Sequence, residues 1–275
     1  MPLQITRAPL ASGSVETWTL NDPASRNALS EAMVDALLAA CERAAADAKL
    51  RGVVLRGAGG HFCAGGSLGG FAKTIGQPLA ADVADPLVPL NRRFGTLLQA
   101  LCALPQWFIV AVEGAAMGGG FGLVCCADQV LAHTSAQFAT PEVTLGIVPA
   151  QIAPFVLRRL GEGCARQWLL GGQRWSASQA QEAGLVQTVI QATDAAHWQS
   201  QLQHQLEICA QAAPQAVAAT KKLLATIGGQ SLDASLNQGA QAFASALRSA
   251  EAGAGLKAFS SKQPAPWTCN AGGTS

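Results

Sequence analysis

The chain has 275 residues, of which 49% are hydrophobic and 13% are charged, and its formal net charge is +1. This length fits one large α/β domain, with or without a helical appendage, and the apolar content excludes a disordered chain. Charged residues are about half as frequent as in an average soluble protein. We therefore expect apolar surface to be buried between the subunits of a homo-oligomer.

The distribution of charge also limits the partners and the compartment. Lysines and arginines are scattered, so the chain lacks the basic stripe that binds nucleic acid. The first residues lack the layout of a secretory signal, and no stretch approaches the roughly 20 apolar residues of a membrane span. We expect a soluble, cytoplasmic protein that binds neither nucleic acid nor membrane.

The cysteines show no sign of a metal site. There are eight of them, without a C-x-x-C pair and without histidines at metal-ligand spacing. We expect reduced, mostly buried thiols, because free cysteine behaves as a small core hydrophobe.

Strands and helices are predicted to alternate in the first part of the chain. In chain order, the predicted strands are residues 15–20, 53–55, 108–112, 130–132, a short segment around Phe138, and 185–190. The predicted helices are 30–45, 87–101, 152–160, 164–170 and 178–183, the first capped by Ser30. Glycine-rich loops are expected at 57–70 and 114–122. This alternation is typical of βαβ units.

Beyond residue 192 the strand signals disappear. Helical periods remain at 196–210, 214–227 and 231–250. We divide the chain into a core of residues 1–191, a helical C-terminal region of residues 192–262 and a flexible tail of residues 263–275.

Three loops stand out: residues 61–67 and 116–122 are rich in glycine, and residues 140–143 carry the carboxyl group of Glu142. Glycine lets backbone N–H groups face a ligand with no Cβ in the way. Two loops that direct N–H donors at one point would make an oxyanion hole, and a nearby carboxylate would transfer a proton. The alternative is that these loops are only tight turns between strands and helices.

Other motifs fit poorly. Gly120-Phe121-Gly122 lacks the third glycine of a dinucleotide-binding loop, and no phosphate-binding P-loop motif occurs. Residues 65–69 match the G-x-S-x-G elbow of α/β-hydrolases around Ser67, and aspartates and histidines follow in the required order. That elbow needs a strand leading directly into the serine. The predicted strand ends at Leu55, which argues against a serine hydrolase.

The sequence resembles the crotonase, or enoyl-CoA hydratase/isomerase, superfamily over residues 5–267. The segments that carry the resemblance are Asn27-Ala28-Leu29, residues 57–68, residues 111–120, Pro141-Glu142 with Leu145-Gly146, and Ala183-Gly184-Leu185-Val186. The resemblance implies an α/β fold of the crotonase (ClpP-like) type, a spiral of ββα turns with a helical C-terminal trimerisation region. It also implies a homotrimer, or a hexamer built as a dimer of trimers.

The resemblance further implies an acyl-CoA thioester as substrate, with coenzyme A as part of the substrate, and neither a separate cofactor nor a metal. The backbone N–H groups of Gly66 and Gly119 would hold the thioester carbonyl, and Glu142 would transfer the proton. The residues implied along coenzyme A are Arg26, Ala64, Gly66, Ser67, Leu68 and, from a neighbouring subunit, Lys257 or Lys262. For each lysine, an ordinary solvated surface charge is the alternative.

The chain departs from the family pattern at Gly122, where hydratases usually carry their first glutamate. Glu142 is then the carboxylate left in a family catalytic position. One acid suits a double-bond shift, and it also permits hydration if it returns the proton of water to C2. Gly122 also vacates space that a bulkier acyl group could use.

Further positions refine the prediction. Ala150 replaces an acid of some relatives, which disfavours dienoyl isomerisation and aromatic dehalogenation. Residues 145–154 look similar to hydratases of branched substrates, such as isohexenylglutaconyl-CoA hydratase. Gln151 would either face the pocket or cap the next helix. Glu113 is a further carboxylate that could reach the site. Asp128 is expected to serve packing and hydrogen bonding, and His61 is expected to lie on the surface.

The first hypothesis is therefore an enoyl-CoA hydratase, a lyase of fatty acid metabolism. The alternatives are a Δ3,Δ2-enoyl-CoA isomerase, an acyl-CoA thioesterase that uses Ser67 or a Glu142-activated water, and a non-catalytic acyl-CoA-binding protein.

Overall fold

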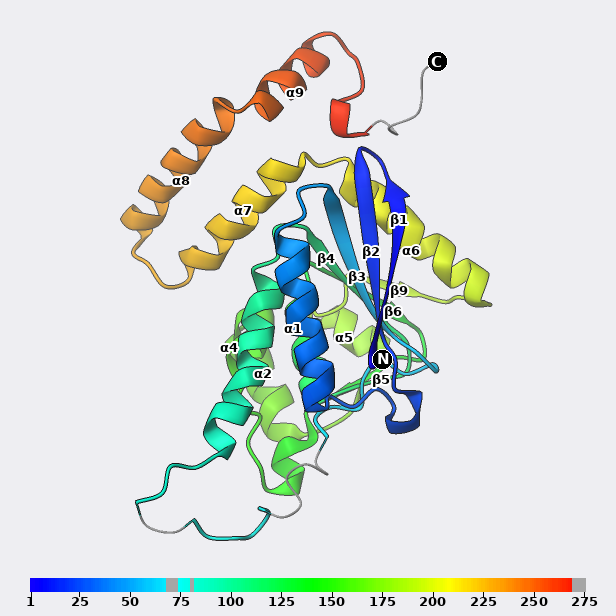
Figure 1. Cartoon of the computed structure of the whole chain (residues 1–275), viewed down its shortest axis with the longest axis vertical. Coiled ribbons are helices and arrows are strands. Elements are labelled where there is room, and N and C mark those ends of the chain that lie inside the picture. The colour runs from blue at the N-terminus through cyan, green and yellow to red at the C-terminus, as the bar shows by residue number, and fades with distance from the viewer. Residues whose placement is uncertain (68–73, 80–81, 269–275) are drawn as a thin grey trace.

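The computed structural model describes residues 1–67, 74–79 and 82–268. At its centre lies a six-stranded sheet in the order β1-β2-β3-β4-β6-β9 (Figure 1). β1 and β2 pair antiparallel, and the remaining neighbours pair parallel. The strands are β1 Leu3–Leu10, β2 Gly13–Leu20, β3 Leu50–Gly57, β4 Trp107–Val112, β6 Gln129–His133 and β9 Thr188–Ile190.

A smaller three-stranded sheet has the order β5-β7-β8. Its strands are β5 Ala115–Met117, β7 Gln137–Ala139 and β8 Trp175–Ser176. β5 pairs parallel with β7, and β7 pairs antiparallel with β8. Because β5 follows β4 directly and β7 follows β6, the chain passes twice from the larger sheet to the smaller one, and the expected loop 114–122 lies at the first of these passages.

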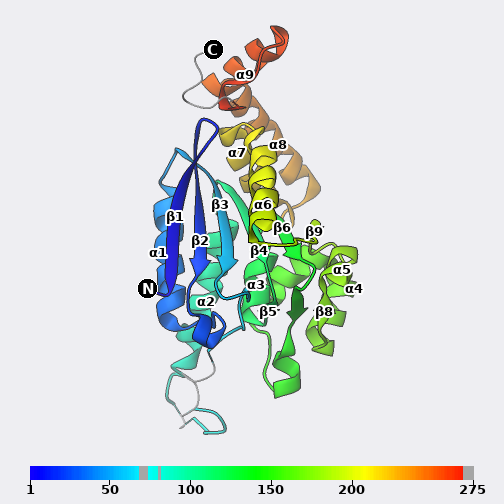
Figure 2. The same ribbon diagram turned by 90° about the vertical axis from the view of Figure 1, so that its right-hand side faces the viewer.

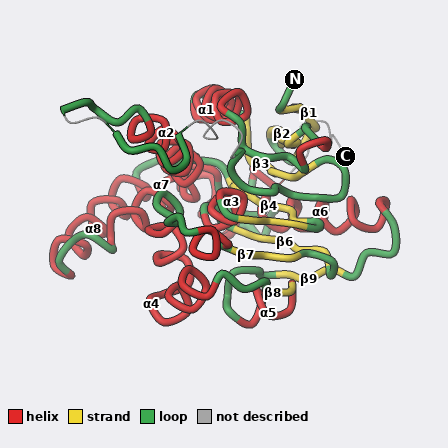
Figure 3. Tube along the Cα trace, turned by 90° about the horizontal axis from the view of Figure 1, so that it is seen from below, coloured by secondary structure: helices red, strands yellow, loops and turns green. Residues whose placement is uncertain are grey.

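Helices cover both faces of the larger sheet. Seen from below, α6 lies on the opposite side of the strands from α4 (Figure 3). The helices of the first part of the chain are α1 Glu31–Ala45, α2 Leu87–Cys102, α3 Gly119–Cys125, α4 Ala153–Gly171 and α5 Ala177–Glu182. Short 3-10 helices span Pro23–Ser25, Pro141–Leu145 and Pro266–Thr268.

The alternation of side chains along the strands produces two hydrophobic cores. In β3, Val53 and Leu55 belong to the larger core under α1 to α4, whereas Val54 belongs to the smaller core under α6. Phe108 and Ile109 of β4 divide in the same way. Strands buried on both faces have continuous apolar sequences, as expected for a parallel sheet covered on both sides.

The C-terminal helices project from this body. They are α6 Ala195–Ala210, α7 Pro214–Ile227, α8 Leu232–Leu247 and α9 Ala250–Ser260. Figures 1 and 2 show α8 and α9 extending beyond the end of the sheet. These two helices expose large apolar side chains, namely Leu232, Leu236, Phe243, Leu247, Leu256 and Phe259. Such a surface is typical of a contact between subunits, and the homotrimer or hexamer stays a prediction.

The structure confirms the mixed α/β fold and most predicted elements. Ser30 caps α1 by accepting a hydrogen bond from the Met33 amide at 3.2 Å. The predicted helices 152–160 and 164–170 are confirmed as two helical segments of α4, separated by Gly161, whose φ of 72° and ψ of 167° are not helical. All seven cysteines among the described residues are free, and Cys269 lies outside them. No described helix is long and apolar enough to cross a membrane.

Three expectations about elements were wrong. β1 was missed, because it is an edge strand in which Leu3 and Leu10 are its buried residues and no apolar alternation marks it. The expected loop 114–122 contains β5 and the first turn of α3. The expected helix 231–250 is divided into α8 and α9, because Ser249 caps a new helix by accepting from the Ala252 amide.

Candidate functional site

Backbone hydrogen bonds bring the two glycine-rich loops together. The Cys63 amide donates to the Ala115 carbonyl at 2.8 Å, and the Met117 amide donates to the Cys63 carbonyl at 2.9 Å. On the other side, the Leu29 amide donates to the Gly65 carbonyl at 2.8 Å. The loop around Gly65 is thus held between the segment before α1 and the strand β5.

The third loop joins the second one at Gly118. The Gly118 amide donates to the Ala139 carbonyl at 2.8 Å, which places β7 and the following Glu142 beside the start of α3. Gly118 has φ +50°, and a Cβ there would lie 2.8 Å from Oε1 of Glu142. Only glycine suits this position, since any side chain would be strained and would displace the carboxyl group.

Two amides are left as open donors at this junction. Gly119 is the first residue of α3, so its N–H has no intrahelical acceptor. The Gly66 N–H takes part in no backbone hydrogen bond within the described residues, although its neighbours Gly65 and Ser67 both bond to Leu29. A Cβ on Gly66 would meet no atom within 4 Å. Gly66 therefore borders open space, whereas a Cβ on Gly119 would lie 2.9 Å from Cδ1 of Leu29, although both glycines line the same cavity.

Glu142 carries the carboxyl group that adjoins these donors. Its Oε2 atom is buried without a hydrogen-bond partner. Burial raises the pKa of the Glu142 carboxyl above the ordinary value of 4.5, and a backbone hydrogen bond opposes this in part. A carboxylate that is poorly solvated and unpaired is a stronger base than one in water, which suits it to proton transfer.

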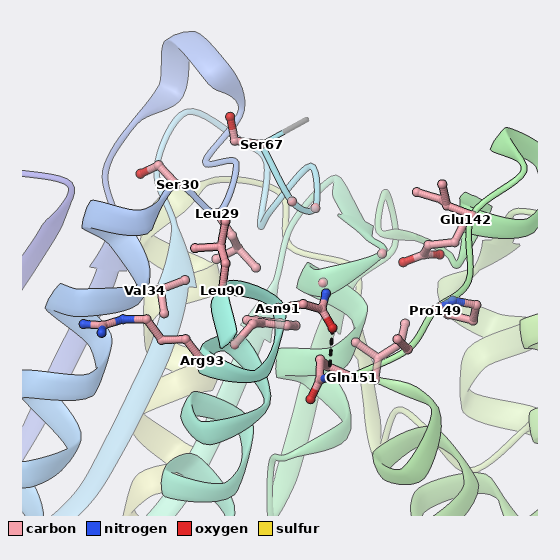
Figure 4. Close-up of a pocket in the computed structure, with 18 of the residues that line it drawn as sticks. Leu29, Ser30, Val34, Ser67, Leu90, Asn91, Arg93, Glu142, Pro149 and Gln151 are labelled. Carbon is pink, nitrogen blue, oxygen red and sulfur yellow. Dashed lines mark hydrogen bonds between the residues drawn. The ribbon is translucent and has the colours of Figure 1, made fainter. Parts of the chain in front are cut away.

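Glu142, Gly66 and Gly119 line one cavity of about 530 Å³. Figure 4 shows the Glu142 carboxyl group directed into this cavity from one side, with Asn91 and Gln151 at another wall. Most of the remaining wall is apolar and comes from α1, α2 and the segment before α4, through Leu29, Val34, Leu90, Phe94, Leu145, Ile147, Val148, Pro149 and Ile152. The volume is in the range of small-molecule sites.

Only some of the residues predicted to lie along coenzyme A line the cavity. Ala64 and Ser67 line the cavity. Arg26 does not line it, but its carbonyl accepts a hydrogen bond from the Ala64 amide at 3.0 Å. Lys257 lies on α9 and does not line the cavity of its own chain. Leu68 lies outside the described residues.

The expectation that Gly122 leaves space for a larger ligand was wrong. Gly122 is buried and does not line the cavity. A Cβ on Gly122 would lie 2.3 Å from Cγ2 of Ile152 and 3.7 Å from Cδ1 of Leu98. Ile152 therefore fills the volume that a side chain at position 122 would occupy. Ile152 itself lines the cavity.

Replacing Gly122 with alanine should destabilise the fold by about 1–3 kcal/mol, the usual cost of overpacking a core. Ile152 belongs to the same core and is 3% exposed, so it has little room to move. The double variant Gly122→Ala/Ile152→Ala should lose less unfolding free energy than the sum of the losses in the two single variants, because removing the Ile152 side chain makes room for the new Cβ. Denaturant unfolding of the two single variants and the double variant measures this coupling, and simple additivity would contradict the contact.

Other polar residues have structural roles. Glu113 pairs with Arg56 at 3.2 Å and does not line the cavity, so the expected spare carboxylate lies away from the site. Asp128 accepts from the Phe108 amide at 2.8 Å and pairs with Lys221. Gln151 lines the cavity, while the N-cap of α4 is Ile152 without a side-chain hydrogen bond, which excludes capping by Gln151.

Sequence reasoning missed the contribution of α2 to the cavity. The sequence predicted a helix over residues 87–101 but assigned none of its residues to the site, whereas Leu90, Asn91 and Phe94 line the cavity. The sequence did contain one signal. Asn91 lies three residues before Phe94 and seven before Leu98, so this polar residue falls on the apolar face of the predicted helix. Among the described residues, no cluster of three or more histidine, cysteine, aspartate or glutamate side chains could hold a metal ion.

Comparison with known proteins agrees with this geometry. The family model described as enoyl-CoA hydratase/isomerase matches residues 11–270. The chain is 34% identical to the 2,3-dehydroadipyl-CoA hydratase of Escherichia coli (strain K12) over 246 residues, covering 89% of this chain and 91% of that protein.

Solved structures show the same likeness. Pseudomonas aeruginosa AtuE superposes with a TM-score of 0.88 at 42% identity, covering 98% of this chain and 100% of that one. An enoyl-CoA hydratase/isomerase from Marinobacter aquaeolei superposes with a TM-score of 0.87 at 38% identity, covering 96% of this chain and 98% of that one. The family match, the shared fold and the pairing of two glycine loops with one glutamate lead to one conclusion: this chain belongs to the enoyl-CoA hydratase/isomerase family, the crotonase superfamily.

Proposed function

We propose that this protein adds water across the C2–C3 double bond of an α,β-unsaturated acyl-CoA thioester. The observation that carries the proposal is the position of the Glu142 carboxyl beside Gly118, in the same cavity as the free amides of Gly66 and Gly119. Several curated relatives are named enoyl-CoA hydratases, which supports the same reaction.

In this mechanism the thioester oxygen accepts hydrogen bonds from the N–H groups of Gly66 and Gly119. Glu142 removes a proton from water, and the resulting hydroxide forms a bond to C3. The electron pair of the double bond moves toward the thioester, whose oxygen carries the enolate charge against the two donors. Glu142 then returns its proton to C2, so that one molecule of water is added and the base is regenerated.

A Δ3,Δ2-enoyl-CoA isomerase is the second candidate, because Gly122 leaves Glu142 as the carboxyl group that adjoins the glycine loops. The same carboxylate would take a proton from C2 and deliver it to C4. A serine-based thioesterase is not favoured. No histidine is present among the described residues that line the cavity, so Ser67 lacks a base.

We further propose how coenzyme A binds and which branch of the family this is. Ala64 and Ser67 would contact coenzyme A, Arg26 and Leu68 would flank it, and Lys257 would reach it from a neighbouring subunit of a homotrimer or hexamer. The segment from Leu145 to Pro154 lines the cavity at seven positions, Leu145 and residues 147–152, which supports a hydratase of branched substrates such as isohexenylglutaconyl-CoA. We propose that it acts in the cytoplasm.

The pH dependence of this reaction follows from Glu142. The carboxyl must be ionised to accept a proton, and burial raises its pKa. The kcat/KM value should therefore fall as the pH decreases through a value above 4.5, at a higher pH than an exposed glutamate would give. A pH–rate profile with the best substrate measures this. An acid limb at or below 4.5 would contradict the role of a buried base.

The reaction itself is tested with a panel of short, long, branched and carboxylated enoyl-CoA esters, followed by mass spectrometry. A gain of one water identifies a hydratase. An unchanged mass with a moved double bond identifies an isomerase, and release of free coenzyme A identifies a thioesterase. Either of the last two results, without hydration of any ester, overturns the first proposal.

A further inference from the structure

We propose that hydroperoxides oxidise a reactive thiolate at Cys102, and that Cys126 then forms a disulfide with it. These two residues, here called the thiol pair, are both free cysteines in the structure. Neither of them lines the cavity that contains Glu142. The inference therefore assigns a modification site outside the candidate active site, and it does not depend on the proposed hydration reaction.

The thiol pair lies where the ends of two neighbouring helices meet. Cys102 is the last residue of α2, and Cys126 directly follows α3. Sγ of Cys102 lies 4.0 Å from the carbonyl oxygen of Cys126. Sγ of Cys126 lies 3.5 Å from the carbonyl oxygen of Leu98, one helical turn before Cys102. The two thiols are thus close enough to interact directly.

Positively charged side chains surround Cys102. Nη2 of Arg158 donates a hydrogen bond to Sγ of Cys102 at 3.0 Å. Arg159 and Lys221 also interact electrostatically with Cys102. Asp128 brings a carboxylate to the same cluster, where it is paired with Lys221. Because the guanidinium of Arg158 bonds to the sulfur itself, the cluster stabilises Cys102 as an anion.

These contacts change the acidity of Cys102. A hydrogen bond from the Cys126 thiol and the charge of Arg158 lower the pKa of Cys102 from 9.0 to about 7, although burial opposes them. At neutral pH a large share of this side chain is therefore thiolate, the form that reacts as a nucleophile. Burial instead raises the pKa of Cys164, a thiol on α4 that is likewise half-buried. Partial exposure alone thus does not distinguish Cys102.

The first step is the oxidation of Cys102 by a hydroperoxide. The thiolate sulfur attacks the terminal oxygen of the peroxide, so that an S–O bond forms and the O–O bond breaks. The sulfur loses two electrons and the peroxide gains them. The hydroxide or alkoxide that leaves takes a proton from water, and Cys102 becomes a sulfenic acid.

Cys126 completes the reaction. Its sulfur attacks the sulfur of the sulfenic acid, an S–S bond forms, the S–O bond breaks, and the departing hydroxide leaves as water with the proton of Cys126. Burial, together with the hydrogen bond and the charge of Cys102, raises the pKa of Cys126 and keeps it protonated at first. The last two effects end when Cys102 is oxidised, whereas the charge of Arg158 still favours the thiolate of Cys126. Oxidation therefore begins at Cys102.

The first test treats the reduced, folded protein with hydrogen peroxide at neutral pH and then blocks the remaining thiols with iodoacetamide. Chymotrypsin cuts between the two cysteines, after Phe108 and Phe121, so that mass spectrometry identifies a cross-linked peptide. We expect a Cys102–Cys126 link that has lost two hydrogen atoms. Cys102 should be oxidised at least roughly 10-fold faster than Cys164, because its thiolate fraction is larger.

A sample unfolded in urea is the control for this test. The difference between Cys102 and Cys164 should disappear there, because the folded chain creates it. Three results overturn the proposal: no oxidation of Cys102 in the folded protein, equal rates at Cys102 and Cys164, or a link from Cys102 to a residue other than Cys126.

Variants assign the two roles within the thiol pair. Cys126→Ala should stop the reaction at the Cys102 sulfenic acid, which dimedone traps, and Cys102→Ser should leave Cys126 reduced. Arg158→Gln should slow the oxidation of Cys102 by roughly 3- to 10-fold, since the thiolate fraction falls. Arg166→Gln replaces an exposed arginine of the same helix and should keep the native rate. Thermal unfolding checks that each variant is folded. Slower oxidation in both arginine variants or in neither, or no trapped sulfenic acid in Cys126→Ala, overturns the assignment.

Discussion

Glu142→Gln should lower kcat by roughly 10²–10⁴-fold, the usual contribution of a positioned acid–base group. Glutamine keeps the size of the side chain but cannot accept the proton of water at neutral pH. The backbone donors at Gly66 and Gly119 are untouched, so the KM for the enoyl-CoA ester should change little. Steady-state kinetics and calorimetry with a saturated ester separate these two effects.

The control for this variant is Glu113→Gln, because Glu113 pairs with Arg56 outside the cavity. It should keep normal kcat. A loss in both variants, or in neither, would contradict Glu142 as the proton-transfer group.

Glu142→Gln should also be at least as stable as the native protein. Burial raises the pKa of the carboxyl, so the folded state holds this proton more tightly than the unfolded chain does. Ionisation therefore weakens the folded state as the pH rises through the raised pKa. The advantage of the variant should appear near pH 7 and shrink toward pH 4, which thermal unfolding at several pH values measures.

Gly66→Pro should lower kcat by roughly 10²–10³-fold, because it removes one N–H donor from the oxyanion hole. Proline lacks the N–H, whereas the bonds of Gly65 and Ser67 to Leu29 do not use the Gly66 amide. Gly65 precedes it with φ +98°, a conformation in which the absence of a Cβ limits conflict with the new ring.

Gly66→Ala is the matched control, since alanine keeps the N–H and its Cβ would meet no atom within 4 Å. It should retain kcat within a few-fold of the native enzyme. Circular dichroism and thermal unfolding show whether the proline variant is folded. If both variants lose activity to the same degree, the Gly66 amide is not a donor to the thioester.

Local sequence patterns determined most of the elements. The apolar periods of α1 and α2, the cap at Ser30 and the continuous apolar strands β3 and β4 depend on neighbours along the chain, and the structure confirms them. The edge strand β1 could not be predicted in this way. Its stability comes from pairing with β2, in a register from Leu3 with Leu20 to Leu10 with Gly13, and not from an apolar face of its own.

The motif resemblance determined the family and the residues to examine at the site. It selected Glu142, Gly66 and Gly119, and the structure brings these three to one cavity. Their roles stay a prediction until the variants are measured. The resemblance also identified Gly122 as a departure from the pattern, but it could not tell what fills the vacated space.

That last question was decided by tertiary structure. Ile152 is 30 residues from Gly122 in the chain, yet its Cγ2 occupies the place of the missing side chain. In the same way, Asn91 and Gln151 are 60 residues apart, and Nε2 of Gln151 donates to Oδ1 of Asn91 at the wall of the cavity. The fold class, the family and the candidate carboxylate could be predicted from the sequence, because they depend on local periods and on spacing within loops. The shape and polarity of the acyl cavity depend on contacts between distant segments, which only the folded chain defines.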